Sequence, residues 1–126
     1  MTITSRKLNT SNLSANEEAL VRCQAALELK DRGDYAGAQK IMSPVWVGLS
    51  ERPNTEHLYP SVAAEVVLSV GILTCWISNR LQLTENREVA KNLITESISY
   101  YESTGDVKKV AAARAELGYC YWWRGD

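Results

Sequence analysis

The amino-acid sequence predicts an all-α protein of about five helices, folded as antiparallel helical hairpins. Apolar residues recur three and four positions apart, and the alternation typical of strands is nearly absent. Two Gly-Asp pairs, at 33–34 and 105–106, each separate two such stretches. Glycine there ends one helix in the left-handed conformation, and aspartate caps the next. The helices are expected at residues 15–32, 35 to about 49, 60–81, 85 to about 103, and 107–124.

The first two helices carry specific signals for where they begin and end. Ser14 and Glu17 form a capping box, in which each side chain accepts a hydrogen bond from the other residue's backbone amide. Pro44 lies inside the second helical stretch. Because proline lacks an amide proton and clashes with the preceding turn, we expect a kink or a break near Met42 and Ser43.

The third helix is expected to be the core of the fold. Pro60 suits its first turn, and the apolar run at 66–77 leaves it without a polar face in the middle. That run is shorter than the roughly 20 residues needed to span a membrane, so we interpret it as a buried helix. Thr84 is the expected cap of the fourth helix.

Composition is that of an ordinary globular domain. The 126 residues include 45% hydrophobic and 23% charged residues, with a net charge of −1. Fourteen basic against fifteen acidic residues argue against a nucleic-acid-binding surface. Residues 1–13 are polar and expected to be flexible, with no apolar stretch of signal-peptide length. We therefore expect a cytoplasmic protein that contacts neither nucleic acid nor membrane.

Metal and redox chemistry are not indicated by the three cysteines. Cys23, Cys75 and Cys120 are far apart in the chain, and His57 is the single histidine. Without a Cys-x-x-Cys pair or enough histidines, zinc lacks ligands. We expect reduced, mostly buried thiols and no metal or cofactor.

Catalytic templates find no match. A nucleophilic triad would have to use His57, which lies in a loop-like stretch without a glycine-framed nucleophile. Gly-rich phosphate loops are absent from the sequence, and paired carboxylates such as Glu17-Glu18 lie in first helical turns, where they favourably face the helix dipole. The protein is therefore not expected to be an enzyme.

The four tryptophans divide into two groups. Trp46 and Trp76 each follow an apolar run and are expected in the core. Trp122 and Trp123 are adjacent on the last helix, about 100° apart, so both can hardly face one core.

Three occurrences of one pattern suggest an internal repeat. The first occurrence is residues 26–38, which include Gly-Asp-Tyr. The second is Gly71 with Ala90, and the third is residues 117–126, which end in Gly-Asp. The pattern resembles the tetratricopeptide repeat (TPR), in which antiparallel helix pairs pack through small residues. The resemblance implies helix contacts at Ala26, Gly71 and Gly118 in first helices and at Ala38 and Ala90 in second helices. Intervals of 45 and 47 residues exceed the usual repeat of about 34, so armadillo- or HEAT-like repeats and an irregular bundle stay open.

The resemblance also implies an inner groove formed by the first helix of each pair. The expected partner-binding residues are Leu27, Lys30, Leu68, Ile72, Trp76, Tyr119, Trp122 and Trp123. Such an apolar and aromatic surface suits an apolar peptide or helix better than an acidic tail. An equally weighted alternative is that the N-terminal segment or a further helix covers these residues.

Residues 104–126, TGDVKKVAAARAELGYCYWWRGD, resemble the longer repeats of bacterial signalling and regulatory proteins. The final Gly-Asp would mark the middle of a hairpin, so residues 14–126 are expected to be the N-terminal part of a longer array. The predicted function is a protein–protein interaction or scaffolding module, with a homodimer through the last helix. Alternatives are a ligand- or peptide-sensing domain of a transcription regulator, and a closed structural bundle.

Overall fold

The computed structural model describes residues 14–123, with the backbone alone for Trp123. Within this range the chain is all-α and contains no strand, which confirms the predicted class. The five helices are α1 (Ala15–Asp31), α2 (Tyr35–Met42), α3 (Pro60–Leu81), α4 (Glu85–Thr104) and α5 (Val107–Trp123). The segment expected to be flexible, residues 1–13, and the final Gly-Asp pair lie outside the described residues.

Most helix ends form as the sequence predicts. Ser14 Oγ accepts from the Glu17 amide at 3.2 Å, and Glu17 Oε1 accepts from the Ser14 amide at 3.3 Å. Gly33 is left-handed, with φ of +80°, and the Asp34 carboxylate accepts from the Gly37 amide at 2.9 Å. The capping box and the first Gly-Asp signal are therefore confirmed.

The α3–α4 turn differs from the expectation. Thr84 makes no capping hydrogen bond with its side chain and already has helical backbone angles, whereas a capping residue is normally extended. Thr84 therefore holds the predicted position before α4, but its side chain does not cap the helix. Gln82 ends α3 in the left-handed conformation, with φ of +58°, and the Leu83 amide donates to the Ser78 carbonyl at 2.8 Å.

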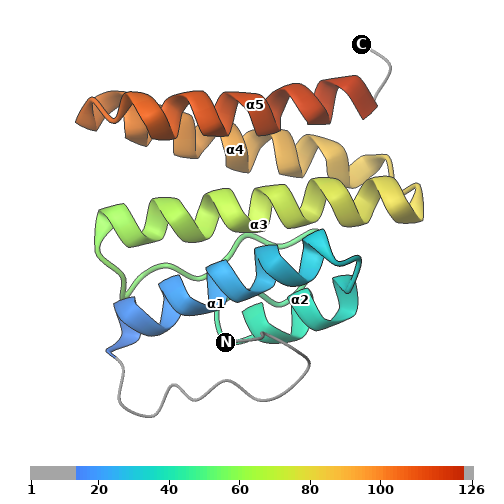
Figure 1. The fold of residues 1–126 in the computed structure, drawn as a ribbon, viewed down its shortest axis with the longest axis horizontal. Coiled ribbons are helices and arrows are strands. Elements are labelled where there is room, and N and C mark those ends of the chain that lie inside the picture. The colour runs from blue at the N-terminus through green and yellow to red at the C-terminus, as the bar shows by residue number, and fades with distance from the viewer. Residues whose placement is uncertain (1–13, 124–126) are drawn as a thin grey trace.

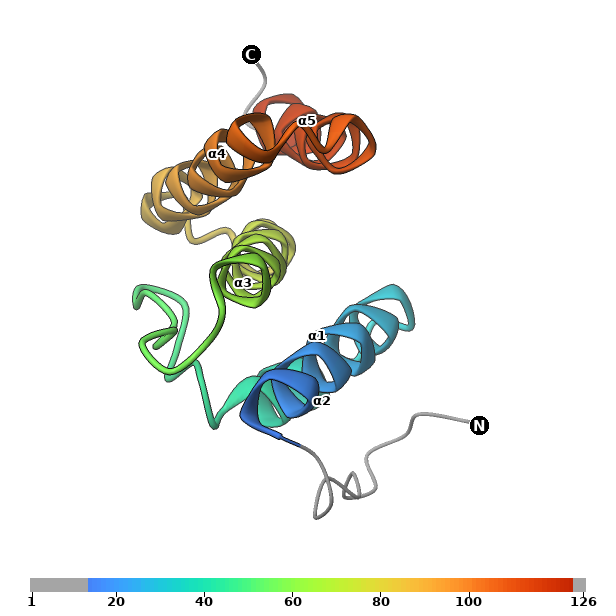
Figure 2. The ribbon, with the colours of Figure 1, turned by 90° about the vertical axis from the view of Figure 1, so that its left-hand side faces the viewer.

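Consecutive helices pack against one another as antiparallel neighbours (Figure 1). Short turns join α1 to α2, α3 to α4, and α4 to α5. As a result α1, α3 and α5 run in the same direction and face the viewer in Figure 1. Figure 2 shows α4 and α5 next to each other above α3, with α5 on the same side of the stack as α1 and with α2 beneath α1.

Two hydrophobic clusters form the core, and α3 contributes to both. One cluster joins α1, α2 and the following loop to α3, and the other joins α3, α4 and α5. Buried residues of α3 lie on all its sides from Val66 to Cys75, as expected for a central helix. By length and composition α3 is apolar enough to cross a membrane, but 78% of its most apolar 18-residue stretch is buried inside the fold.

Small residues mark most of the expected helix contacts. Ala26, Ala38 and Ala90 are completely buried. At Gly71, an added Cβ would lie 2.8 Å from Ile94 Cγ1 and 3.2 Å from the Ile94 amide nitrogen, so α4 packs directly on the α3 backbone.

Gly118 is different, because it makes no helix contact among the described residues. An added Cβ at Gly118 would have no neighbour within 4 Å. The reason is rotational: α5 turns Ala113 and Cys120 into the core and leaves Gly118 exposed.

The loop between α2 and α3 packs as part of the core. The break expected near Met42 and Ser43 is confirmed, because α2 ends at Met42. Trp46 is buried in the first cluster, as predicted, and its Nε1–H donates to the Glu51 carbonyl at 3.2 Å. The loop therefore replaces the second half of the expected helix.

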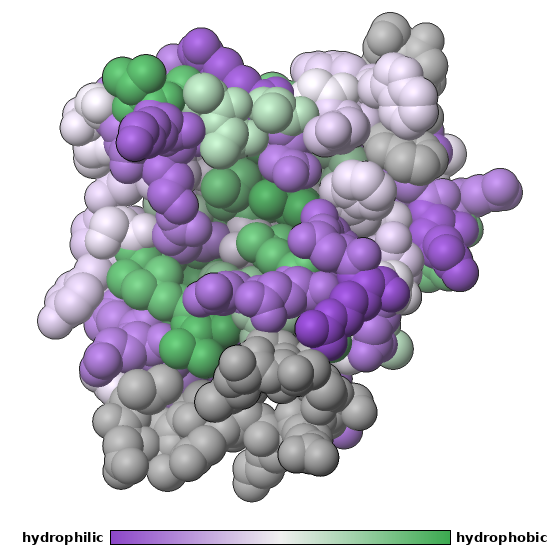
Figure 3. Space-filling model, in the orientation of Figure 1, coloured by the Kyte–Doolittle hydropathy of each residue, from purple (hydrophilic) through white to green (hydrophobic). Residues whose placement is uncertain are grey.

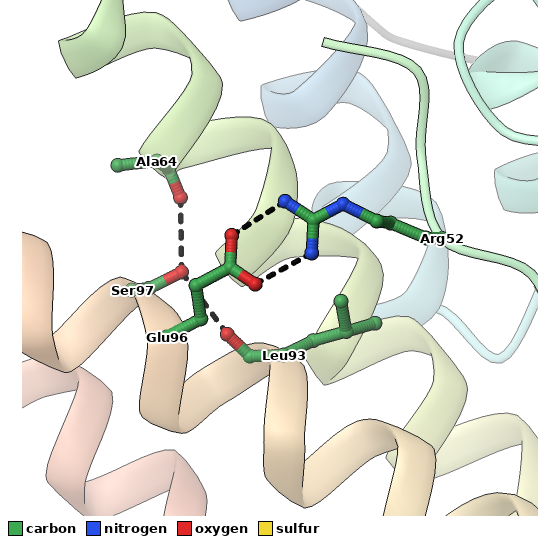
Figure 4. A network of polar contacts seen from close by, with 5 residues as sticks. All are labelled: Arg52, Ala64, Leu93, Glu96 and Ser97. Atoms are coloured by element: carbon green, nitrogen blue, oxygen red, sulfur yellow. Dashed lines mark hydrogen bonds and ion pairs between the residues drawn. The ribbon is translucent and has the colours of Figure 1, made fainter.

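An ion pair fastens this loop to α4 (Figure 4). Arg52 donates two parallel hydrogen bonds, of 2.5 and 2.6 Å, to the Glu96 carboxylate. Next to it, Ser97 Oγ donates to the Ala64 carbonyl of α3 at 3.1 Å and lies 3.3 Å from the Leu93 carbonyl. The hydrogen bond from Arg52 holds the pKa of Glu96 below its ordinary value.

Two of the helical glycines, Gly71 and Gly118, should respond oppositely to replacement by alanine. Gly71→Ala is expected to lower the free energy of unfolding by about 1–3 kcal/mol, because Ile94 and its backbone must move. Gly118→Ala is expected to raise it by about 0.5–1 kcal/mol, because alanine favours the helix and meets open space. Urea denaturation followed by circular dichroism measures both. Changes of the same sign would contradict the packing described here.

Glu96→Gln should destabilise the protein at neutral pH and not in acid. The folded state lowers the pKa of Glu96, so the stabilisation is present above the unfolded pKa of about 4.3 and disappears as the pH falls through the folded value. Because the pair is about half exposed, we expect a loss of about 0.5–1 kcal/mol at pH 7 and almost none at pH 3.

Urea denaturation at the two pH values measures this difference. Glu102→Gln, which removes the exposed single bond from Arg114, is the control and should cost less at pH 7. An equal loss for Glu96→Gln at both pH values would show that the carboxylate charge is not responsible.

Candidate interaction groove

The face formed by α1, α3 and α5 carries the candidate site. Figure 3 views this face and shows apolar surface gathered along its middle, with hydrophilic residues around and across it. The three helices run in the same direction, so residues from each can line one continuous strip.

One row of side chains crosses the three helices. Lys30 Nζ of α1 lies 4.8 Å from the centroid of the Trp76 ring of α3. The Trp76 ring in turn lies 5.9 Å from the Tyr119 ring of α5, with an angle of 52° between the two planes. These distances suit a cation–π contact and a tilted aromatic pair. We call these three residues the Lys30–Trp76–Tyr119 row, and all three belong to the groove expected from the sequence.

The other expected groove residues lie in different places. Leu27 is partly buried and packs against both hydrophobic clusters. Leu68 and Ile72 are buried in the second cluster, so, contrary to the expectation, they serve the core and offer a partner little surface. Their side chains point from α3 towards its neighbouring helices, which an all-round apolar helix allows. Trp122 is 68% exposed, and the Trp123 side chain lies outside the described residues.

A cavity of about 530 Å³ opens on the same face, between α1, α3 and the start of α5. Its apolar wall includes Leu20 and Leu27, and its polar wall includes Glu65, Tyr101 and Lys109. The Lys109 ammonium forms an ion pair with the Glu65 carboxylate. Leu27 is shared by the expected groove and this cavity, whereas Tyr101 and Lys109 were not expected there.

Both groove lysines lie against a carboxylate. Lys109 pairs with Glu65, and Lys30 pairs with Asp31 at 3.0 Å. Burial raises the pKa of the Cys23 thiol to about 11, and burial together with the Glu65 charge raises the pKa of Tyr101 far above its ordinary value. At neutral pH, Cys23 and Tyr101 are therefore protonated. A surface of this kind favours an apolar occupant over an anionic one.

Two observations on the described residues bear on catalytic and metal chemistry. His57 is exposed in the loop before α3. Among residues 14–123, no group of three or more His, Cys, Asp or Glu side chains is placed to hold a metal ion.

The exposed side of α5 bears a second feature. Ala111, Ala115, Gly118 and Trp122 follow one another at spacings of four, three and four residues, and all are exposed. That spacing puts them on one face of the helix. The face is narrow and flat around Gly118, where a second helix can approach closely.

Comparisons of the chain with protein-family models, with curated proteins and with solved structures found no match. The TPR resemblance therefore stays a prediction from the residues, and the function rests on the geometry of the groove.

Proposed function

We propose that this chain is a non-catalytic protein-interaction module that binds an apolar or aromatic segment of another protein along α1, α3 and α5. The observation that carries the proposal is the Lys30–Trp76–Tyr119 row, which places one side chain from each of three helices in a continuous strip. Helical hairpins stacked in the manner of TPR-like repeats would present such a strip to a peptide. Aromatic residues are the commonest anchors of protein interfaces.

Tyr119 is the side chain that a partner would bury most usefully. It is 49% exposed, and its contact with Trp76 reduces the freedom it has left to lose on binding. A large aromatic side chain buries about 150–250 Å² in full. Covering the exposed half at about 25 cal/mol per Å² is worth about 2–3 kcal/mol, enough to decide whether a peptide binds.

The charges on this face favour an apolar partner. A groove that holds an acidic tail needs cations that are not already neutralised. Here Lys30 and Lys109 each face a carboxylate of this chain. An anionic partner would have to displace Asp31 or Glu65, whereas an apolar segment leaves both pairs intact.

Ligand sensing is the second candidate, and the cavity beside Glu65 and Lys109 favours it. Its volume of about 530 Å³ lies in the range of small-molecule sites, which are mostly apolar with a few polar groups. A small ligand would contact Leu20, Tyr101 and Lys109 without needing Tyr119. The two candidates therefore predict different sensitive residues.

Peptides selected on the full chain from a random 15-residue display library should depend on Tyr119. Tyr119→Ala is expected to weaken their binding by about 30-fold or more, because it removes about 2–3 kcal/mol of burial. Tyr121→Ala, on another side of the same helix, is the matched control and should change the affinity by less than about threefold. Isothermal titration calorimetry measures both, with circular dichroism to verify that each variant is folded.

Three results would contradict the proposal of a peptide groove. Equal losses from Tyr119→Ala and Tyr121→Ala would place the peptide on another surface. Selected peptides that lose affinity only on Leu20→Ala or Lys109→Ala would favour the cavity. A library that yields no peptide binder would remove the support for a groove.

Self-association through α5 is a further prediction, based on the exposed face around Gly118 and Trp122. We expect sedimentation velocity to show a concentration-dependent dimer, and Trp122→Ala to weaken it by more than about tenfold, as for a central aromatic anchor. Tyr59→Ala, an exposed aromatic residue just before α3, should leave the dimer unchanged. A monomer at every concentration would contradict this prediction.

A further inference from the structure

Two of the three cysteines meet between α3 and α5. Cys75 Sγ and Cys120 Sγ lie 2.7 Å apart, and the two residues are only 2% and 1% exposed. A sulfur–sulfur bond is about 2.05 Å long, so the two atoms need to approach by less than about 1 Å. Cys23 is separate: it lies on α1, in the other hydrophobic cluster, with its Sγ 4.0 Å from the Glu65 carbonyl.

We infer that Cys75 and Cys120 form a reversible disulfide that joins α3 to α5 when the protein meets an oxidising thiol–disulfide pool. The bond would close a loop that contains all of α4 and the turn on either side of it. Because 45 positions separate the two cysteines, the link would constrain a long stretch of the unfolded chain.

The surroundings of Cys75 favour its role as the nucleophile. Asn79 Nδ2–H donates to Cys75 Sγ at 3.7 Å. The hydrogen bond from Cys120 lowers the pKa of Cys75 and outweighs burial and the Glu116 charge, which both raise it; the Arg87 charge also lowers it. The pKa of Cys23 moves the opposite way, to about 11, because burial dominates there. Since the thiolate is the reactive form, Cys75 is more reactive than Cys23.

The reaction needs an oxidant, and a low-molecular-weight disulfide supplies it. The Cys75 thiolate attacks one sulfur of that disulfide, forms a mixed disulfide and releases one thiolate, which takes up the Cys75 proton. The Cys120 thiolate then attacks the Cys75 sulfur and releases the second thiolate, which takes up the Cys120 proton. The protein gives up two electrons and two protons, and one small disulfide becomes two thiols.

Access to the pair requires α5 to move. Among the described residues, α5 packs against α4 and, less extensively, against α3, and Cys120 lies in its last turns. Lifting that end of α5 from α3 exposes both sulfurs, and closing the bond then holds the end in place.

The disulfide would also fix the aromatic pair. Cys75 precedes Trp76 and Cys120 follows Tyr119, so the same two backbones carry both contacts. The consequence, a groove that is more rigid in the oxidised protein, rests on the proposed function. Formation of the bond does not, and the experiment measures the bond itself.

The test uses the full chain, incubated with excess oxidised glutathione and separately with dithiothreitol. After acid quenching and alkylation, intact mass gives the number of free thiols, and peptide mass spectrometry locates the link. We expect loss of two thiols, a single Cys75–Cys120 linked peptide, and an alkylated Cys23. The oxidised protein should melt about 10 °C higher than the reduced protein.

Variants and one unfolded control decide the outcome. Cys23→Ala should retain both the link and the shift in melting temperature, whereas Cys75→Ala and Cys120→Ala should lose both. The mapping on the wild-type chain needs no variant, so a poorly folded alanine variant does not weaken the test. Three free thiols in the folded chain, under conditions that cross-link it in guanidinium chloride, would overturn the inference. A mapped link that involves Cys23 would also overturn it.

Discussion

Burial of α3 on all sides is the constraint on which the rest of the structure depends. This helix is the common wall of both hydrophobic clusters, so α1 and α2 on one side and α4 and α5 on the other have a core only through it. Its helix-forming pattern is apolar without a polar stripe, and no two-layer arrangement covers such a helix. Packing on α3 therefore sets the order of the stack, and Gly71 sets how near α4 can come.

The groove follows from the same constraint. Helices on both sides of α3 bury every residue from Val66 to Cys75, and the strip that faces the space between α1 and α5 is only partly covered at its two ends. Glu65 and Trp76 lie along this strip and meet Lys109 and Tyr119 of α5. An uncovered strip on a central helix needs polar or amphipathic side chains at its edge, and the ion pair and the tilted rings provide them. These four residues, at the margin of the core, thus give the face its chemistry.

The helices could be predicted from the sequence because their signals are local. Ser14 with Glu17, the Gly33-Asp34 pair and Pro44 act within a few residues, and each ends or starts a helix where expected. Thr84 precedes α4 as predicted, but its side chain does not cap the helix; the turn is set instead by Gln82, which adopts a left-handed conformation that glycine normally takes. For the site, the pattern identified Lys30, Trp76 and Tyr119 but not which way α3 turns. A helix apolar on all sides has no periodic signal for rotation, so the burial of Leu68 and Ile72 could not be read from it.

The partners of α5 required knowledge of the fold. Gly118 was expected in a helix contact and lies in open space, whereas Cys120, two residues later and on the opposite side, reaches Cys75. Two residues along a helix point about 200° apart, so a small error in the predicted rotation of α5 about its axis exchanges its buried and exposed sides. The chain contained no local signal for this contact, because Cys75 and Cys120 are 45 residues apart and meet only where α5 packs on α3. The same end of α5 brings Tyr119 to Trp76 and Cys120 to Cys75, and this makes α5 the helix whose position both the thiols and the aromatic row determine.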